Sequence, residues 1–198
     1  VGHWAMDDNG GGQAYDSSGS GNNGTLIGAT WTTNSATGVS ALEFDGSGDY
    51  VTVPEDDADF DFSSTFTISA WINYDPGNGG VAVAGKTFGS YQFLLDTSSN
   101  RLLLQLNSKT VIAGSSNTLT PNTWTHVAVV YDSASGARTY IDGVLDKQNT
   151  GFRENVKTTN VPLKIGGTGY NVSKSFSGVM DEVKIYNIAL SEEEIAEA

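Results

Sequence analysis

The sequence predicts an all-β protein of antiparallel strands, arranged as a sandwich or a barrel, for three reasons. Short segments alternate apolar and polar residues, turn-forming clusters separate these segments at regular spacing, and helix signals are nearly absent. The chain has 198 residues, which suits one all-β domain with one sizeable core. No linker or change of composition divides it, so we expect a single domain over residues 1–198.

The clearest strand is expected at residues 65–74, where apolar and polar side chains fall on opposite faces. Its inward face would carry Phe66, Ile68, Ala70, Ile72 and Tyr74. Residues 101–107 repeat the pattern, with Leu102, Leu104 and Leu106 facing in. The polar cluster Asp96–Asn100 before them predicts a hairpin with a strand at residues 91–95.

The remaining elements follow from the same signals. Asp142 and Gly143 predict a tight turn. Only the end of the chain predicts a helix, because Ser191 can cap a first turn of three glutamates and Glu194 can complete a capping box. Further strands are expected at residues 41–44, 50–53, 125–131, 138–141, 163–165 and 179–186.

Composition excludes several classes of function. With 10 basic and 23 acidic residues the formal charge is −13, so the chain lacks the basic stripe that nucleic acids require. It has no cysteine and two histidines, which excludes thiol chemistry and leaves no imidazole cluster for a transition metal. Any metal would be a hard cation on oxygen ligands. No apolar run reaches the length of a membrane span.

Residues 80–87 match the phosphate-loop pattern G-x-x-x-x-G-K-[ST] in letters only. That loop needs a helix after it, whose N-terminus holds the phosphate. Here a β-patterned stretch follows, and the residues inside the pattern are apolar enough to form a strand. The sequence therefore does not predict nucleotide binding at this position.

Catalytic patterns are incomplete. Glu43 and Asp45 begin the E-x-D-x-x-E spacing with which glucanases place two carboxylates around a glycosidic bond, but Gly48 stands where the second glutamate should be. His126 lies within an expected strand, where a packed histidine is the simpler interpretation than a catalytic base. A hydrolase or lyase that uses Glu43 or Asp45 is kept as a minor alternative.

Asp181 stands out among the carboxylates. In the expected strand it has the same parity as Val183 and Ile185, so we expect it to point toward the core, where it needs a partner or a cation. The N-terminal loop at residues 16–24 offers carboxylate, amide and main-chain oxygens of the kind that calcium binds. A turn stabilised by its own Asp and Asn side chains, without an ion, is the alternative.

Seven sequence blocks in order give the chain a resemblance to a known family. They are Trp4–Asp8, Asp16–Leu26, Ala41–Gly46 with Asp49–Val51, Phe66–Trp71, Trp124–Ala128, Tyr140–Gly143 and Gly178–Tyr186. Together they resemble the laminin-G-like domains of the concanavalin A-like lectin and glucanase superfamily.

The resemblance implies a two-sheet antiparallel jelly-roll sandwich with a short C-terminal helix. It also implies a non-catalytic module, cut from a larger secreted or cell-surface bacterial protein, with a structural calcium that ties the N-terminal loop to the last strand. By position the ligands would be Asp16, Asn22 and Asp181, with a main-chain oxygen near Gly24. Trp4, Trp71 and Trp124 would belong to the family's structural framework.

These observations predict a calcium-stabilised carbohydrate-binding module whose partners are a polysaccharide and other domains of the same polypeptide. Aromatic rings and planar polar groups bind sugars, and the candidates are Phe88, Tyr91, Arg101, Gln105, Asn107 and Tyr170. An ordinary solvated face would carry similar residues. A protein-interaction or spacer module without affinity for glycans is the alternative function.

Overall fold

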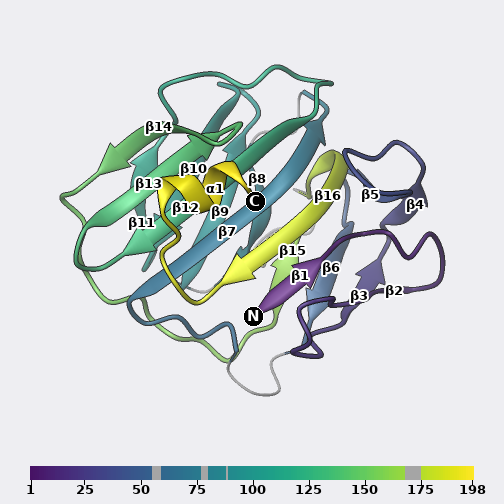
Figure 1. The fold of residues 1–198 in the computed structure, drawn as a ribbon, viewed down its shortest axis with the longest axis horizontal. Helices are drawn as coiled ribbons and strands as arrows, with labels where there is room; N and C mark the ends of the chain where they lie inside the picture. Colours follow the sequence, from purple (N-terminus) through teal and green to yellow (C-terminus); the bar gives the residue numbers. More distant parts are fainter. Residues whose placement is uncertain (55–58, 77–79, 88, 168–174) are drawn as a thin grey trace.

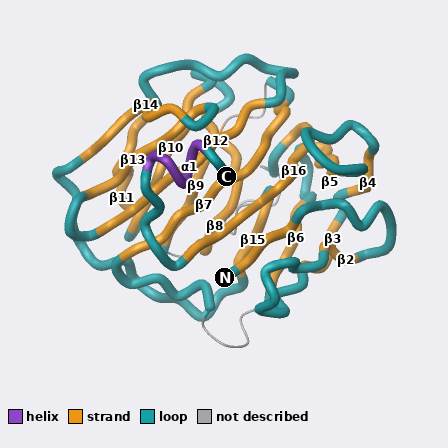
Figure 2. The backbone as a smooth tube through the Cα atoms, viewed as in Figure 1, coloured by secondary structure: helices purple, strands orange, loops and turns teal. Residues whose placement is uncertain are grey.

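The protein is a sandwich of two antiparallel sheets. The computed structural model describes residues 1–54, 59–76, 80–87, 89–167 and 175–198. Figure 1 shows one sheet in front of the other, and Figure 2 shows that strands make up nearly all of its regular structure. The predicted two-sheet antiparallel jelly-roll sandwich is confirmed.

The front sheet, called sheet A, has eight strands. Its two central strands, at residues 65–74 and 177–186, are the longest of the sheet. β1 (Gly2–Trp4) pairs with β16 beside the main path. The order along the path is β14 (Val144–Asn149), β13 (Gly136–Ile141), β12 (Thr125–Asp132), β7 (Thr65–Tyr74), β16 (Ser177–Tyr186), β5 (Ala41–Asp45) and β4 (Thr30–Thr32).

The second sheet, called sheet B, also has eight strands. Its order is β11 (Lys109–Ala113), β10 (Arg101–Leu106), β9 (Tyr91–Asp96), β8 (Gly80–Lys86), β15 (Leu163–Ile165), β6 (Tyr50–Val53), β3 (Gly24–Ile27) and β2 (Gln13–Ala14). The sequence signals miss several short strands, such as β1, β2 and β4, because these lack a long alternating pattern. Residues 80–87, which match the phosphate-loop letters, lie in and just after β8 and precede another strand.

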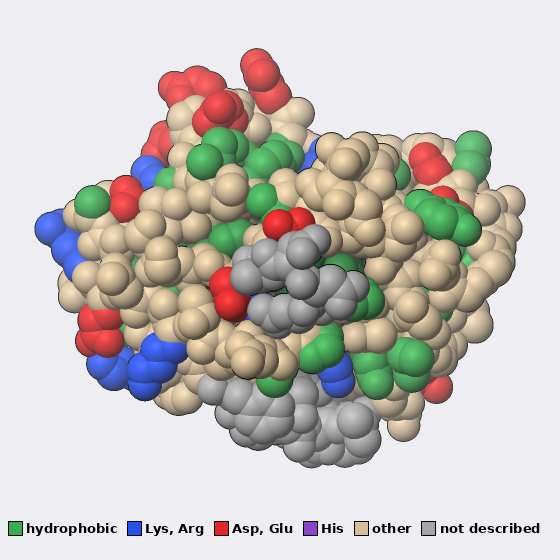
Figure 3. Space-filling model, turned by 90° about the horizontal axis from the view of Figure 1, so that it is seen from below, with side chains coloured by type: hydrophobic (Ala, Val, Ile, Leu, Met, Phe, Trp, Pro, Cys, Tyr) green, Lys and Arg blue, Asp and Glu red, His purple; other side chains and the backbone are tan. Residues whose placement is uncertain are grey.

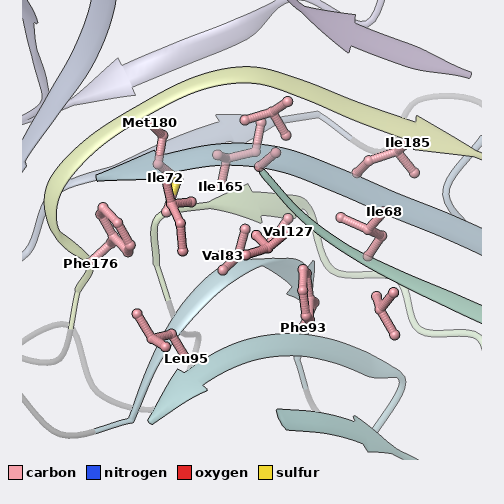
Figure 4. Packing of buried hydrophobic residues seen from close by; sticks show 14 of the residues in the cluster. Ile68, Ile72, Val83, Phe93, Leu95, Val127, Ile165, Phe176, Met180 and Ile185 are labelled. Carbon is pink, nitrogen blue, oxygen red and sulfur yellow. The ribbon is translucent and has the colours of Figure 1, made fainter. Parts of the chain in front are cut away.

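The core lies between the sheets, where inward side chains from both meet (Figure 4). Ile68 and Met180 come from sheet A, and Val83, Phe93 and Ile165 come from sheet B. The predicted inward residues of the 65–74 and 101–107 segments are all buried, which confirms both patterns. Each such side chain contributes roughly 1.5–3 kcal/mol of hydrophobic stabilisation.

The outer face of sheet A is covered by the C-terminal segment. Leu190 and Ile195 pack on side chains of β12 and β13, namely Ala128, Val130 and Tyr140. The helix α1 (Glu192–Ala196) is capped by Ser191, and the capping box with Glu194 is present as predicted. This small second cluster leaves little of the outer face of β12 open to solvent.

No helix in the described ranges is long and apolar enough to cross a membrane. On the face drawn in Figure 3, acidic side chains are scattered among neutral ones, and the basic side chains lie in small separate groups. No continuous basic stripe is visible on that face.

Candidate functional site

A row of polar residues crosses the whole outer face of sheet B. Directly paired residues of neighbouring strands project their side chains to the same side of a sheet. The pairings run without a break through Gln13, Thr25, Thr52, Lys164, Gly85, Gln92, Gln105 and Thr110, one residue from each strand. We call this set the polar row. Strands lie about 4.8 Å apart, so it spans about 34 Å.

The side-chain amides of Gln92 and Gln105 are half-buried in the polar row. The side chains of Gln92 and Gln105 form no hydrogen bond with any other residue that the structure describes. Each amide can donate and accept, as sugar hydroxyls do. They border a hollow of about 210 Å³ whose other lining residues are Lys86, Gly89, Ser90 and Ser108.

Of the predicted sugar-binding residues, Gln105 alone lines this hollow among those that are described. The prediction for Tyr91 is wrong, because its ring is fully buried in the core and its hydroxyl donates a hydrogen bond to the main-chain oxygen of Phe60. Tyr91 is the first residue of β9, and its side chain points inward together with that of Phe93. Phe88 and Tyr170 lie outside the described residues.

Arg101 and Asn107 are engaged in holding loops. The guanidinium of Arg101 donates to the main-chain oxygens of Ser115 and Ser116. The side-chain amide of Asn107 donates to the Asn155 oxygen and accepts from the Lys157 N–H. The polar groups of Arg101 and Asn107 therefore stabilise these loops.

Sequence reasoning missed Gln92, Thr52 and Lys164 as members of the row. Each alternates with apolar neighbours, so its outward orientation could be predicted from parity. Their alignment could not, because it depends on which strands pair and in which register. Lys164 pairs with Thr52 on one side and with Gly85 on the other, and these three positions are far apart in sequence.

Asp181 is fully buried as predicted, but its predicted direction is wrong. It pairs with Trp71 on the outer face of sheet A, whereas its neighbour Met180 lies in the core. A bulge after Asp181, with Glu182 at φ 48°, restores the inward direction of Val183. A β-bulge adds one residue and shifts parity, which the alternating pattern cannot reveal.

Asp181 is buried because a loop covers it. Its carboxylate accepts hydrogen bonds from the main-chain N–H groups of Ala36 and Thr37 and from that of Glu182. Burial raises the pKa of Asp181, and these three hydrogen bonds oppose the rise. The partner that the sequence required is therefore a set of main-chain N–H groups.

Asp16 is held in a different place. Its two oxygens accept hydrogen bonds from the main-chain N–H groups of His3, Ser18 and Asn22 and from the Ser18 hydroxyl. Burial disfavours the charged carboxylate, but the hydrogen bonds outweigh it and the pKa of Asp16 is lowered. Asp16 and Asp181 share no hydrogen-bond partner.

The other predicted calcium ligands are also engaged. The Asn22 side chain donates to the oxygens of Val1 and Asp59, and Gly24 lies in β3, paired with Ala14. No group of three or more Asp, Glu, His or Cys residues in the described ranges is arranged to hold a metal. This donor set does not fit a shared calcium ion, because the contacts of both carboxylates are N–H or O–H donors in separate places.

The N-terminal loop and the last strand are tied together by direct contacts. β1 pairs with β16 in register, from Gly2 with Ile185 to Trp4 with Val183. His3 donates its main-chain N–H to Asp16, and its Nε2 lies 2.8 Å from the Glu182 carboxylate. These contacts link the same two segments that the calcium was expected to link.

Glu43 and Asp45 are exposed on β5 and line neither of the two hollows described in this subsection. Asp45 accepts a hydrogen bond from the Ser47 N–H and donates its own N–H to Asp49. Burial, with the nearby Asp45 charge, raises the pKa of Asp49. The carboxylates of this region therefore hold the turn between β5 and β6.

A second hollow, of about 310 Å³, lies on the outer face of sheet A. Trp71 and His126 form its floor, with ring centroids 5.6 Å apart, and the 195–198 segment forms one wall. His126 is nearly buried, and desolvation, with the Lys184 charge, lowers its pKa against the opposing effect of Asp142. Trp4, one of the three tryptophans expected in the structural framework, is fully buried.

The two packed sheets, with a short C-terminal helix on one outer face, define the class of the protein as a jelly-roll sandwich domain. The laminin-G family model described as the concanavalin A-like lectin/glucanases superfamily matches residues 45–196. The chain belongs to this family. No curated protein matches it.

Similar solved structures support the same fold. Domain 4 of AbnA, a GH43 extracellular arabinanase from Geobacillus stearothermophilus in complex with arabinotriose, is 19% identical with a TM-score of 0.76, covering 99% of this chain and 96% of that one. The binding domain of Paraclostridial Mosquitocidal Protein 1 is 18% identical with a TM-score of 0.74, covering 97% and 52%. Trypanosoma rangeli sialidase is 17% identical with a TM-score of 0.69, covering 99% of this chain and 32% of the sialidase.

Proposed function

We propose that this domain is a non-catalytic carbohydrate-binding module that binds a glycan chain along the polar row. The observation that carries the proposal is the alignment of polar side chains across the sheet, broken only at Gly85, with the hollow beside Gln92 and Gln105. A glycan presents hydroxyls at regular intervals, and the row offers amides and hydroxyls that form no hydrogen bond with a described residue.

The similar domain of the arabinanase, which was solved with arabinotriose, lends support at the level of the fold. Because fold alone does not assign function, the proposal depends on the row itself. We further propose that the module is attached to a secreted or cell-surface enzyme or adhesin, since similar folds occur as parts of longer proteins.

The absence of catalysis is part of the proposal. A glycosidase needs two carboxylates on either side of the scissile bond, at about 5–10 Å from each other, in the cleft that holds the sugar. The hollow beside the polar row has no carboxylate among its lining residues, and Glu43 and Asp45 lie elsewhere.

The proposal is tested by binding to a glycan array, followed by titration calorimetry with the best ligand. Removing both amides, Gln92→Ala with Gln105→Ala, should weaken binding roughly tenfold or more, because each lost hydrogen bond costs about 0.5–1.5 kcal/mol. Gln148→Ala is the matched control, since Gln148 is an exposed glutamine on β14 of sheet A.

If no glycan binds, the protein-interaction or spacer function replaces the lectin function. If glycan binds and the double variant binds equally well, the site is not on the polar row. Unchanged binding by Gln148→Ala with weakened binding by the double variant supports the proposal.

The structural calcium remains a separate prediction, and the proposal assigns it no role in binding. The melting temperature in calcium and in EDTA tests it. A fall on chelation would support the ion, while an unchanged value would indicate that the main-chain N–H groups around Asp16 and Asp181 suffice.

A further inference from the structure

Lys164 is a half-buried cation on the outer face of sheet B. Its ammonium lies 4.0 Å from the centre of the Tyr50 ring and forms no ion pair with a carboxylate in the described ranges. By contrast, Lys86 lies 2.6 Å from Asp61, and Lys184 lies 3.2 Å from Glu182. In a chain with 23 acidic residues, a half-buried ammonium on the outer face without a carboxylate partner is a candidate binding group.

The surroundings of Lys164 leave its charge poorly compensated. Desolvation by burial lowers the pKa of Lys164, and no acid among the described residues opposes this effect. The contact with the Tyr50 ring offsets only part of the free energy of hydration that the ammonium loses, because an exposed cation–π contact is worth about 0.5–1 kcal/mol. A negatively charged group supplied by a ligand would form a charge-assisted hydrogen bond with the ammonium.

The neighbour of Lys164 in the polar row is Gly85, and only glycine fits there. A Cβ atom at this position would lie 2.5 Å from the Tyr91 oxygen and 2.8 Å from the Gln92 Cα, both in the main chain. The row therefore has no side chain between Lys164 and Gln92, whose strands are two spacings, or about 10 Å, apart. Gly85 itself is buried, and in the row it has the Lys164 cation on one side and the amides of Gln92 and Gln105 on the other.

We infer that the ligand of the polar row is an acidic glycan, whose carboxylate or sulfate group binds the Lys164 ammonium while its hydroxyls bind Gln92 and Gln105. The inference rests on the proposed function and names its class of ligand. Carboxylate and sulfate share the chemistry that Lys164 recognises, so the experiment separates them.

The net charge of −13 does not oppose this assignment at the site itself. At physiological ionic strength, exposed charges more than about 8 Å apart are largely screened. Distant carboxylates therefore slow the approach of an acidic ligand, while the contact with Lys164 determines its affinity once it is bound.

The test compares binding of the intact domain to uronate polymers (polygalacturonate and alginate), a sulfated galactan, and neutral arabinan, xylan and galactan. We expect at least one acidic polymer to bind about tenfold more tightly than every neutral one. Lys164→Gln should remove this preference, and Lys164→Arg, which keeps the charge, should restore it. Lys157→Gln serves as control, because Lys157 is exposed and lies off the polar row.

Each result separates this inference from the proposed function. Binding of neutral polymers alone would overturn the acidic ligand but leave the carbohydrate-binding function intact. Acidic binding that survives Lys164→Gln would overturn the role of Lys164. Absence of binding to all polymers would overturn both. Preference for uronate over sulfate, or the reverse, identifies which anion the site takes.

Discussion

The outer faces of the two sheets differ in what covers them. On sheet A, the 187–195 segment accepts and donates hydrogen bonds with Thr67 and packs Leu190 and Ile195 on the strands, and a loop donates two N–H groups to Asp181. On sheet B, the polar row has amides and hydroxyls with no partner among the described residues. Polar groups on the first face are used for stability, and those on the second remain available for a ligand.

The comparison predicts that changes on sheet A alter stability and that changes on sheet B alter binding. The largest effect is expected for Asp181→Ala, which removes a fully buried side chain and leaves the part-buried N–H groups of Ala36, Thr37 and Glu182 without their acceptor. Each unsatisfied group costs about 1–3 kcal/mol, so unfolding in urea should show a loss of about 3 kcal/mol or more.

The control for this variant is Glu43→Ala, an exposed carboxylate on the neighbouring strand β5. It should change the free energy of unfolding by no more than about 0.5 kcal/mol. If both variants lost the same free energy of unfolding, the hydrogen bonds from the N–H groups to Asp181 would not be the source of its stabilising effect.

The next effect is on binding, with stability unchanged. Gln105→Ala alone should weaken glycan binding about three- to tenfold, while its melting temperature stays within about 2 °C of the original. Calorimetry and thermal unfolding measure the two quantities. A large loss of stability with unchanged affinity would show that Gln105 stabilises the fold and does not bind the glycan.

The pH dependence of stability sharpens the comparison, because His126 lies on the covered face. Its pKa is lowered by burial, so between that value and 6.5 the unfolded chain binds more protons than the folded one. The free energy of unfolding should therefore fall as the pH drops below 6.5, by at most about 1.4 kcal/mol per pH unit. His126→Gln should flatten this slope in urea unfolding at several pH values; an unchanged slope would assign it to other groups.

The smallest effect is expected for Tyr140→Phe. The Tyr140 hydroxyl is buried beneath the C-terminal segment and forms no hydrogen bond with a described residue. Removing it should change the free energy of unfolding by less than about 1 kcal/mol, in either direction. A larger loss in urea unfolding would reveal a partner for this hydroxyl.

The sequence predicts the strands better than it predicts the site. Parity alone identifies the inward residues of β7 and β10, because every second side chain of each strand is apolar and enters the core. Parity fails at Asp181, where a bulge shifts the direction of the side chains. It also cannot align Lys164 with Gln92, since that alignment depends on pairing among three strands distant in sequence.

The central claim is that a glycan binds on the outer face of sheet B. Backbone amide chemical shifts of the labelled domain, followed by NMR during titration with the best-binding glycan, test it most directly. The account predicts the largest shifts at Thr52, Lys164, Gly85, Gln92 and Gln105, with little change at Trp71 and His126. Shifts centred on Trp71 and His126 instead would contradict the account and place the ligand on sheet A.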